Sequence, residues 1–527
     1  MRITNKIIQN NNLANINTNK VYQDTLSTQM STQKKINRPS DDPVVAIRAL
    51  RLRSNVTEVT QYYSKNIPDA ESWLSITEDS LNNLTSIITS VIGQCTKGAN
   101  GDLTTSDRQI ILEQLQALGD EIYSTADADY AGRYVFTGYR TDTPMRFDAE
   151  EDVKYSITEQ IDADSIDSLT VINTKSDAGE DLKDLNEVNF ADVDVEAVDI
   201  SSTEVHRIRL AYNVCDDTLP VLSYPVQQTD ANGEVTLDWQ SITTELVHEY
   251  DDNPSPAERV QEASEAGEEV AIYIPETGEL FLSDAAYDKL MNLKDDTTTS
   301  TLNEAEIRVT YEKSDWAIGD LRPEHYFACS STDADGNVIE YNQGYLDGIV
   351  ERQDIEYDVG FNQTIRVNST ADECFKHGIG REVDDLVQAM KEVADMQKIK
   401  ESLEAMKDKV TGADLEALES KLETVSKAYD LLKEKSQRMF EHGITTMQGY
   451  LDEANLSITN CGTRSSKLEL IKNRMQTQKT TFETLKSENE DVDITEIAIQ
   501  LSSAQLTYEA ALMATGKVTQ TSLLNYI

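Results

Sequence analysis

Apolar positions recur at helical spacing near both ends of the chain, whereas the middle alternates short apolar runs with turn residues. From Val56 to Val91 apolar residues return every seven positions, and a second row runs from Ile67 to Ile88. A heptad sustained over this length is typical of long helices packed side by side. A turn at residues 98–101 ends this pattern, and a second helix is predicted from about residue 106 to residue 126.

Helical spacing returns after residue 380, where apolar residues step by three and four through residues 415–432 and 468–485. The last thirty residues repeat the pattern with smaller side chains: Ile497, Leu501, Ala504, Tyr508, Ala511, Thr515 and Val518. A second row, Ile499, Leu506 and Met513, widens the apolar face, and only Glu509 and Lys517 carry charge there. We expect neighbouring subunits to bury this segment, which also includes Leu523 and Leu524 near its end.

The first 33 residues place apolar side chains among many asparagines. Seven Asn lie among the first 19 residues. Asn competes for backbone hydrogen bonds, so a helix here needs a partner, and we expect the isolated monomer to leave it disordered. The apolar residues of this predicted assembly segment are Ile3, Ile7, Leu13, Ile16 and Val21.

A compact helix breaker follows at residues 38–43. It contains Arg38, Pro39, Asp41, Asp42 and Pro43. Each proline disfavours helix at the residue before it, and Pro43 can open the next helix with an aspartate near its positive end. These five residues are therefore predicted to form a loop between two helical elements.

Residues 148–377 have the texture of a β-rich insert. Runs of β-branched and aromatic residues at 234–239, 269–274, 307–311 and 364–367 alternate with turn signals. Three turns, at 230–233, 275–278 and 333–336, each end in the glycine that a hairpin loop favours. Residues 132–138 also indicate a strand between glycines, and residues 284–293 indicate a short helix.

These patterns predict a mainly α protein with a β-rich insert. Both termini are expected to form one long antiparallel helical bundle or coiled coil, and the outer domain to be α+β or all-β. The predicted parts are an assembly helix and loop (1–43), two bundle parts (44–147 and 378–489), the insert (148–377) and a second assembly helix (490–527).

Charge separates the same regions. Residues 148–377 hold 54 Asp and Glu against 14 Lys and Arg, and they account for −40 of the chain's formal net charge of −48. A surface this acidic repels nucleic acid and anionic membranes, so we expect neither as a partner. The first 20 residues lack the features of a signal peptide, and no apolar run reaches the length of a membrane span.

Candidate chemistry is absent from the sequence. The five cysteines form no CxxC pair and are expected to be small buried residues. His248 and Glu249 lack the second histidine of a zinc-protease helix, and no phosphate-binding or nucleophile-elbow motif occurs. The protein is therefore expected not to be an enzyme, and no catalytic residue, metal or cofactor is assigned.

The two ends resemble the hook–filament junction proteins of the bacterial flagellin superfamily. At the N-terminus the resemblance rests on residues 1–5 (MRITN), 36–43 (INRPSDDP), 46–53 (AIRALRLR), 70–74 and the glycine-bounded segment 132–138. At the C-terminus it rests on residues 487–496, 510–512 and 522–527 (SLLNYI). Together these regions cover about half of the chain.

The resemblance implies a structural subunit of the flagellum, exported without a cleaved signal peptide and located outside the cell. Its implied partners are copies of itself in a ring, another hook-associated junction protein, flagellin subunits and an export chaperone. The paired terminal helices would form an inner tube, with the insert projecting outward.

Three alternatives remain open at this point. A filament-forming flagellin shares the terminal helices, although the Asp-Asp-Pro and Ser-Leu-Leu-Asn-Tyr motifs favour the junction protein. A surface adhesin or carbohydrate-binding module on a coiled-coil stalk would explain the acidic insert but not the apolar ends. An intracellular coiled-coil scaffold is disfavoured by the β-rich centre.

Overall fold

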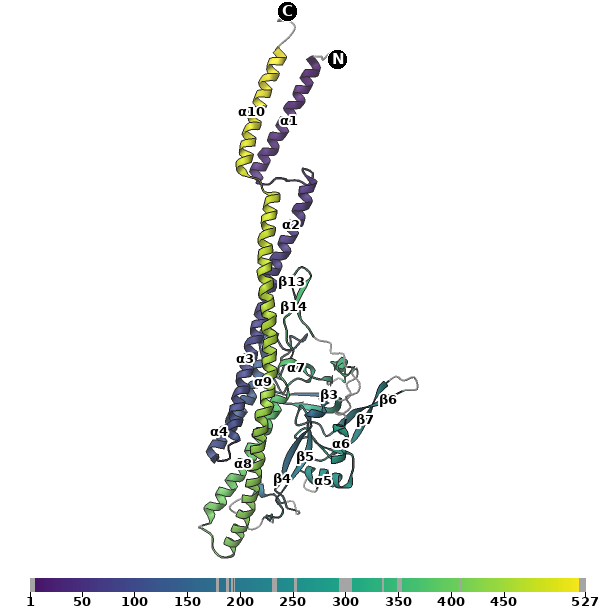
Figure 1. The fold of residues 1–527 in the computed structure, drawn as a ribbon, viewed down its shortest axis with the longest axis vertical. Coiled ribbons are helices and arrows are strands. Elements are labelled where there is room, and N and C mark those ends of the chain that lie inside the picture. The colour runs from purple at the N-terminus through teal and green to yellow at the C-terminus, as the bar shows by residue number, and fades with distance from the viewer. Residues whose placement is uncertain are drawn as a thin grey trace, which may run out of the picture. The chain divides into compact units, whose positions relative to one another are not determined.

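The computed structural model describes residues 5–176, 180–185, 189–190, 193, 195–229, 235–250, 254–292, 306–333, 336–347, 353–407 and 409–520. The chain divides into two compact units, one made of residues 1–71, 357–365 and 465–527 and the other of residues 72–356 and 366–464. The predicted fold class is confirmed, because the ends of the chain form long helices and the middle forms a large sheet (Figure 1).

The first unit contains the helices of both chain ends. Helix α1 (Asn5–Thr32) pairs with α10 (Ile494–Gln520), and the two run in opposite directions (Figure 1). Helix α2 (Pro43–Gln61) passes through a π-helical turn (Tyr62–Asn66) into the start of α3 (Ile67–Gly98). The unit also holds the end of α9 (Ala413–Glu490) and most of a hairpin formed by β13 (Glu356–Gly360) and β14 (Gln363–Arg366).

Residues 5–32 are therefore helical rather than disordered, which differs from the expectation for an isolated chain. The partner that the asparagine-rich helix needs is supplied by α10 of the same chain. Leu26 lies in one buried cluster with Ile497 and Ala504 of α10. Burial of these apolar side chains offsets the weak intrinsic helix propensity of the asparagines.

The second unit begins with a helical bundle. Within it, α3 runs antiparallel to α9, with Gly98 against Phe440 at one end and the Cys461 thiol donating to the Leu74 carbonyl at the other. Helix α4 (Thr105–Ser124) packs against α8 (Gly378–Met406). A capping box between Thr104 and Asp107 opens α4 and satisfies its free backbone donors.

The insert forms a ten-stranded sheet in the order β12-β11-β3-β10-β6-β7-β8-β9-β5-β4. Of the strand pairs described, only β7–β8 is parallel. The strands are β3 (Glu151–Asp162), β4 (Asp167–Asn173), β5 (Ser201–Arg209), β6 (Val221–Thr229), β7 (Val235–Leu246), β8 (Val270–Ile274), β9 (Glu279–Leu282), β10 (Glu306–Trp316), β11 (Ala328–Thr332) and β12 (Val338–Tyr341).

Three short helices accompany the sheet: α5 (Pro256–Ala266), α6 (Asp284–Met291) and α7 (Ala371–Cys374). The strands predicted at 269–274 and 307–311 correspond to β8 and β10, and the predicted helix at 284–293 corresponds to α6. The run at 364–367 lies on β14, and β7 begins in the run at 234–239. The turn at 275–278 is present, with Gly278 at a φ of 65°, whereas the turn at 230–233 lies outside the described residues.

The segment 132–138 was predicted to be a strand, and this was wrong over most of its length. Only β2 (Arg133–Tyr134) is extended, and it pairs with β1 (Asp129–Tyr130). Both flanking glycines have positive φ, 76° at Gly132 and 60° at Gly138, so the chain turns here instead of continuing. The apolar pattern instead reflects Val135 and Phe136, whose side chains are fully buried.

Candidate assembly interface

The α1–α10 pair uses one of the two apolar rows predicted on the last helix. Ile497 and Ala504 are buried against Leu26, with Leu501 packed beside them. Further along the same row, Tyr508, Ala511 and Thr515 are half-buried. On α1, Ile16 is also buried. This row therefore provides contact within the chain.

The other row is open to solvent in the single chain. Ile499, Leu506 and Met513 are exposed to 66%, 68% and 67%. They are spaced by seven residues, so they lie along one side of α10. Three of the predicted interface residues of α1 are exposed as well: Ile7, Leu13 and Val21. Both helices of the pair thus present large apolar side chains that the chain itself does not cover.

The remaining predicted interface residues are not placed by the structure. Ile3, Leu523 and Leu524 lie outside the described residues, and the side chain of Val518, within α10, is likewise not described. Assignment of the whole set to an assembly interface stays a prediction.

The loop between α1 and α2 is organised by its two aspartates. Asp42 caps α2, its carboxylate accepting from the backbone N–H of Val44 at 2.9 Å and of Val45 at 3.1 Å. Asp41 accepts from the N–H of Asn37 and of Arg38, at 3.1 and 2.9 Å. Pro43 is the first residue of α2, where its missing N–H costs nothing. Pro39 and Arg38 lie in the turn before it.

The chain crosses between its long and terminal helices at one joint, formed by residues 33–35 and 490–493. Lys34 and Asp491 form an antiparallel bridge and an ion pair, and the Lys35 N–H donates to the Glu490 carbonyl at 2.7 Å. Asp493 then caps α10 by accepting from the N–H of Thr495 at 2.8 Å. The joint fixes where the α1–α10 pair begins.

Glu490 is the buried charge of this joint, with 2% of its surface exposed. Arg53 of α2 clamps its carboxylate through Nε at 2.6 Å and Nη2 at 2.7 Å, and the Lys34 ammonium lies 3.7 Å away. The hydrogen bond from Arg53, followed by the charges of Arg53 and Lys34, holds the pKa of Glu490 below its ordinary value. Neither Arg53 nor Glu490 was singled out by the sequence analysis.

The sequence analysis also missed a contact of the β13–β14 hairpin within the first unit. Phe361 at its tip meets Tyr62 and Phe482 edge-on, with ring centroids 5.8 and 6.4 Å apart. The Asn66 amide donates to the Asp358 carbonyl at 2.7 Å. The sequence did contain a signal for the turn of this hairpin. Asn362, between β13 and β14, is a residue type that tolerates a positive φ, and it adopts a φ of 52° here.

Other kinds of site are not found in the described part of the chain. It contains no helix both long and apolar enough to cross a membrane, and no cluster of three or more His, Cys, Asp or Glu side chains suited to a metal. All five cysteines are buried, as expected, and none forms a disulfide.

Comparison with known proteins first defines a class. Residues 3–141 match the family of the bacterial flagellin N-terminal helical region. The matched part contains the helices α1, α2, α3 and α4 and the loop between α1 and α2. It therefore includes the N-terminal half of the candidate interface. The N-terminal quarter of this chain is thus similar to the N-terminal helical region of flagellin.

Within that class, the chain is similar to flagellar hook-associated protein 3. It is 30% identical to the protein of that name from Salmonella typhimurium over 168 residues, 31% of this chain and 52% of the relative. It is 31% identical to the Escherichia coli protein over 169 residues, with the same coverage. A flagellin from Clostridium tyrobutyricum is more distant, at 24% identity over 219 residues, 39% of this chain and 55% of the relative.

The alignments thus span about half the length of the hook-associated relatives. The predicted resemblance to a flagellar hook-associated junction protein is confirmed by these matches together with the flagellin-type N-terminal region.

Proposed function

We propose that the protein is a structural subunit of the bacterial flagellum that forms the hook–filament junction, on which flagellin polymerises. The observation that carries the proposal is the α1–α10 pair, in which the two chain ends meet and leave apolar rows uncovered on both helices. Exposed rows of this kind are typical of surfaces that become buried on association. The similarity to hook-associated protein 3 supports the same role.

The proposed partners follow from this arrangement. Copies of the chain would associate through the terminal helices into a ring, with another hook-associated junction protein on one side and flagellin on the other. An export chaperone would cover the apolar rows before assembly, and export would proceed without cleavage of a signal peptide. The acidic insert would face water, and catalysis has no part in the proposal.

Immunogold labelling of sheared flagella tests the proposal. A subunit of the junction is expected to label one spot near the base of each filament. Labelling along the whole filament would instead identify a flagellin, to which the chain has a more distant similarity. Label confined to the cell body, with none on flagella, would contradict both roles and favour a surface adhesin.

A further inference from the structure

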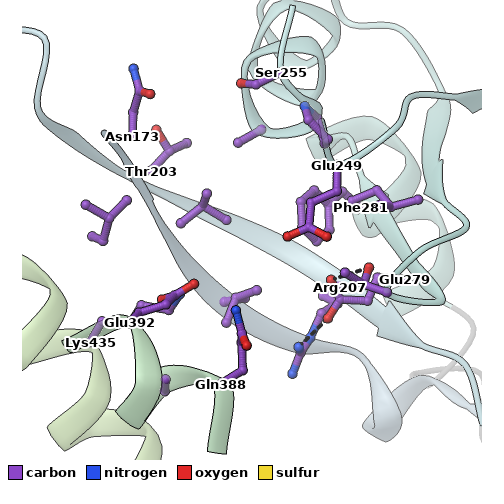
Figure 2. A pocket seen from close by; sticks show the side chains of 18 of the residues that line it. Asn173, Thr203, Arg207, Glu249, Ser255, Glu279, Phe281, Gln388, Glu392 and Lys435 are labelled. Carbon is purple, nitrogen blue, oxygen red and sulfur yellow. Dashed lines mark hydrogen bonds and ion pairs between the residues drawn. The ribbon is translucent and has the colours of Figure 1, made fainter. Parts of the chain in front are cut away.

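A cavity of about 690 Å³ lies within the second unit, between the sheet and the helices α5, α8 and α9 (Figure 2). This volume falls in the range of sites for small organic ligands. No role has been assigned to it above, and it is remote in sequence from the terminal helices. The inference drawn from it is independent of the proposed junction function.

The floor of the cavity is one face of the strands β4, β5 and β9. Val171 lies opposite Thr203, and Arg207 lies opposite Phe281, so these side chains share a face of the antiparallel sheet. Leu169 joins them two residues before Val171. The floor is therefore largely apolar, with the Thr203 hydroxyl and the Arg207 guanidinium on the same face.

The walls come from helices that cover the two sides of this face. Ser255, which caps α5, stands on one side. On the other side α8 presents Asp385, Gln388 and Glu392, whose spacing of three and four residues places them on one face of the helix. Glu249, which follows β7, completes the wall beside α5, as Figure 2 shows.

Two cationic groups of the cavity, Arg207 and Lys435, are engaged in ion pairs. Arg207 is buried and bound to Asp167 at 2.6 Å, Glu279 at 2.6 Å and Asp385 at 2.9 Å. Lys435 pairs with Glu392 at 3.0 Å. These ion pairs tie α8 to the floor and α9 to α8, so the cavity is preformed. The lining as a whole holds more carboxylates than cationic groups.

Several polar side chains of the cavity, in contrast, make no hydrogen bond within the chain. Among the described residues, the side chains of Thr203, Gln261 and Gln388 make no hydrogen bond, and neither does the Glu249 carboxylate. Burial against the cavity wall, with nearby carboxylates, raises the pKa of Glu249 above its ordinary value. Gln388 and Glu249 extend into the space from opposite sides (Figure 2).

We infer that this cavity binds an uncharged saccharide of one or two sugar rings. Sugar hydroxyls both donate and accept, which matches the two amides, the hydroxyl and the carboxylate that line the cavity. The C–H face of a sugar ring is apolar and suits the partly buried side chains of Leu169 and Val171. Phosphorylated and acidic ligands are disfavoured by the surplus of carboxylates.

The test titrates the full chain with N-acetylglucosamine, N,N′-diacetylchitobiose, maltose and cellobiose, using calorimetry and ligand-observed NMR. At least one is expected to bind with a Kd on the order of 1 mM or tighter. Binding to Gln388→Ala and Thr203→Val should each weaken by about tenfold, the loss of one buried hydrogen bond. Lys391→Ala, an exposed change on α8 away from the cavity, should bind as the parent does.

Each variant is checked by thermal unfolding, so that a loss of binding is interpreted only for folded protein.

Spermidine serves as a second probe. Binding of spermidine alone, abolished by added salt, would show that the carboxylates recognise a cation and would overturn the inference. Absence of binding by all four saccharides at about 10 mM would overturn it too, as would equal binding by the parent and the Gln388→Ala variant.

Discussion

At the scale of single residues, the joint between the long and terminal helices depends on one buried carboxylate. Glu490 has lost its water and is compensated by the two-point clamp from Arg53, with Lys34 as a weaker second partner. A bidentate guanidinium–carboxylate pair fixes direction as well as distance. The pair therefore holds α2 to the end of α9 at the point where the chain turns into α10.

The Arg53→Ala variant is expected to weaken this joint by about 1–3 kcal/mol, because it leaves a buried carboxylate without its main partner while Lys34 and water compensate in part. Hydrogen exchange should accelerate at the amides of residues 33–35 and 490–493. Arg48→Ala is the matched control, since Arg48 is an exposed residue of the same helix. Equal exchange in the two variants would contradict the role given to Arg53.

The same pair predicts a dependence on pH. The pKa of Glu490 is lower folded than unfolded, so its contribution to stability is present above the unfolded value of about 4.3 and is lost as pH falls through the folded value. Acid should therefore loosen the joint in the parent protein. In the Arg53→Ala variant, the further loosening of the joint below about pH 4 should be much smaller. Hydrogen exchange at the amides of residues 33–35 and 490–493 measures this loosening.

Gly98 provides a further prediction at this scale. A Cβ at this position would lie 2.5 Å from the buried ring of Phe440, so Gly98→Ala is expected to cost about 1–3 kcal/mol through overpacking and to lower the Tm. Gly93→Ala on the same helix meets no atom within 4 Å and should raise stability by about 0.5–1 kcal/mol. A rise in Tm in both variants would show that Phe440 can move aside.

At the scale of elements, α10 is a helix with two apolar sides. One side, including Ile497 and Ala504, is covered by α1, and the other, including Leu506 and Met513, is open. A helix with apolar residues on so much of its circumference is usually buried on several sides. In the single chain only one of those sides has a partner.

The two sides should respond differently to a charge. Leu506→Glu is expected to leave the helicity and the unfolding of the monomer unchanged, because the position is open, but to prevent assembly by placing an unpaired charge in the contact between subunits. Ala504→Glu should reduce the helicity of the monomer itself, since Ala504 is buried against α1. Circular dichroism measures the helicity and the thermal unfolding of the monomer. Secretion of unpolymerised flagellin reports the failure of assembly.

Normal filaments in a strain that carries Leu506→Glu would show that the open row does not contact other subunits. A clear fall in monomer Tm in the same variant would place Leu506 in a core of the chain's own.

At the scale of the whole molecule, the insert and the α8–α9 hairpin share one core. The insert contributes Leu182, Leu185, Phe190, Val195 and Ile200. These pack with residues of α8 and α9 between Val393 and Leu432. The hairpin is therefore part of a co-folded module within the second unit, and its apolar face depends on the loop before β5 for burial.

Leu182→Ala tests this shared core. Removing a fully buried leucine side chain is expected to cost about 2–5 kcal/mol and to increase hydrogen exchange in α8 and α9 between residues 393 and 432. Val198→Ala is the control, because Val198 belongs to the same segment and is 79% exposed. Unchanged exchange in the two helices after Leu182→Ala would indicate that the hairpin folds without the insert.

The sequence by itself determined the long helices of this protein and some of its strands. The apolar seams of α3, α9 and α10, the strands β8 and β10 and the loop capped by Asp42 all follow from local spacing. This succeeds because the period of apolar residues and the preferences of caps and turns are properties of a few consecutive residues. The resemblance of the ends added the class of protein, since its motifs also lie in short continuous segments.

Only the tertiary structure decided which of these elements meet. Both rows of α10 have helical spacing, and nothing local says which one faces α1. Arg53 and Glu490 stand 437 residues apart in the chain, and the cavity draws on strands β4, β5 and β9 and on helices α5 and α8. Periodicity identifies the faces of an element that are to be buried, whereas the partner that buries each face is set by long-range packing.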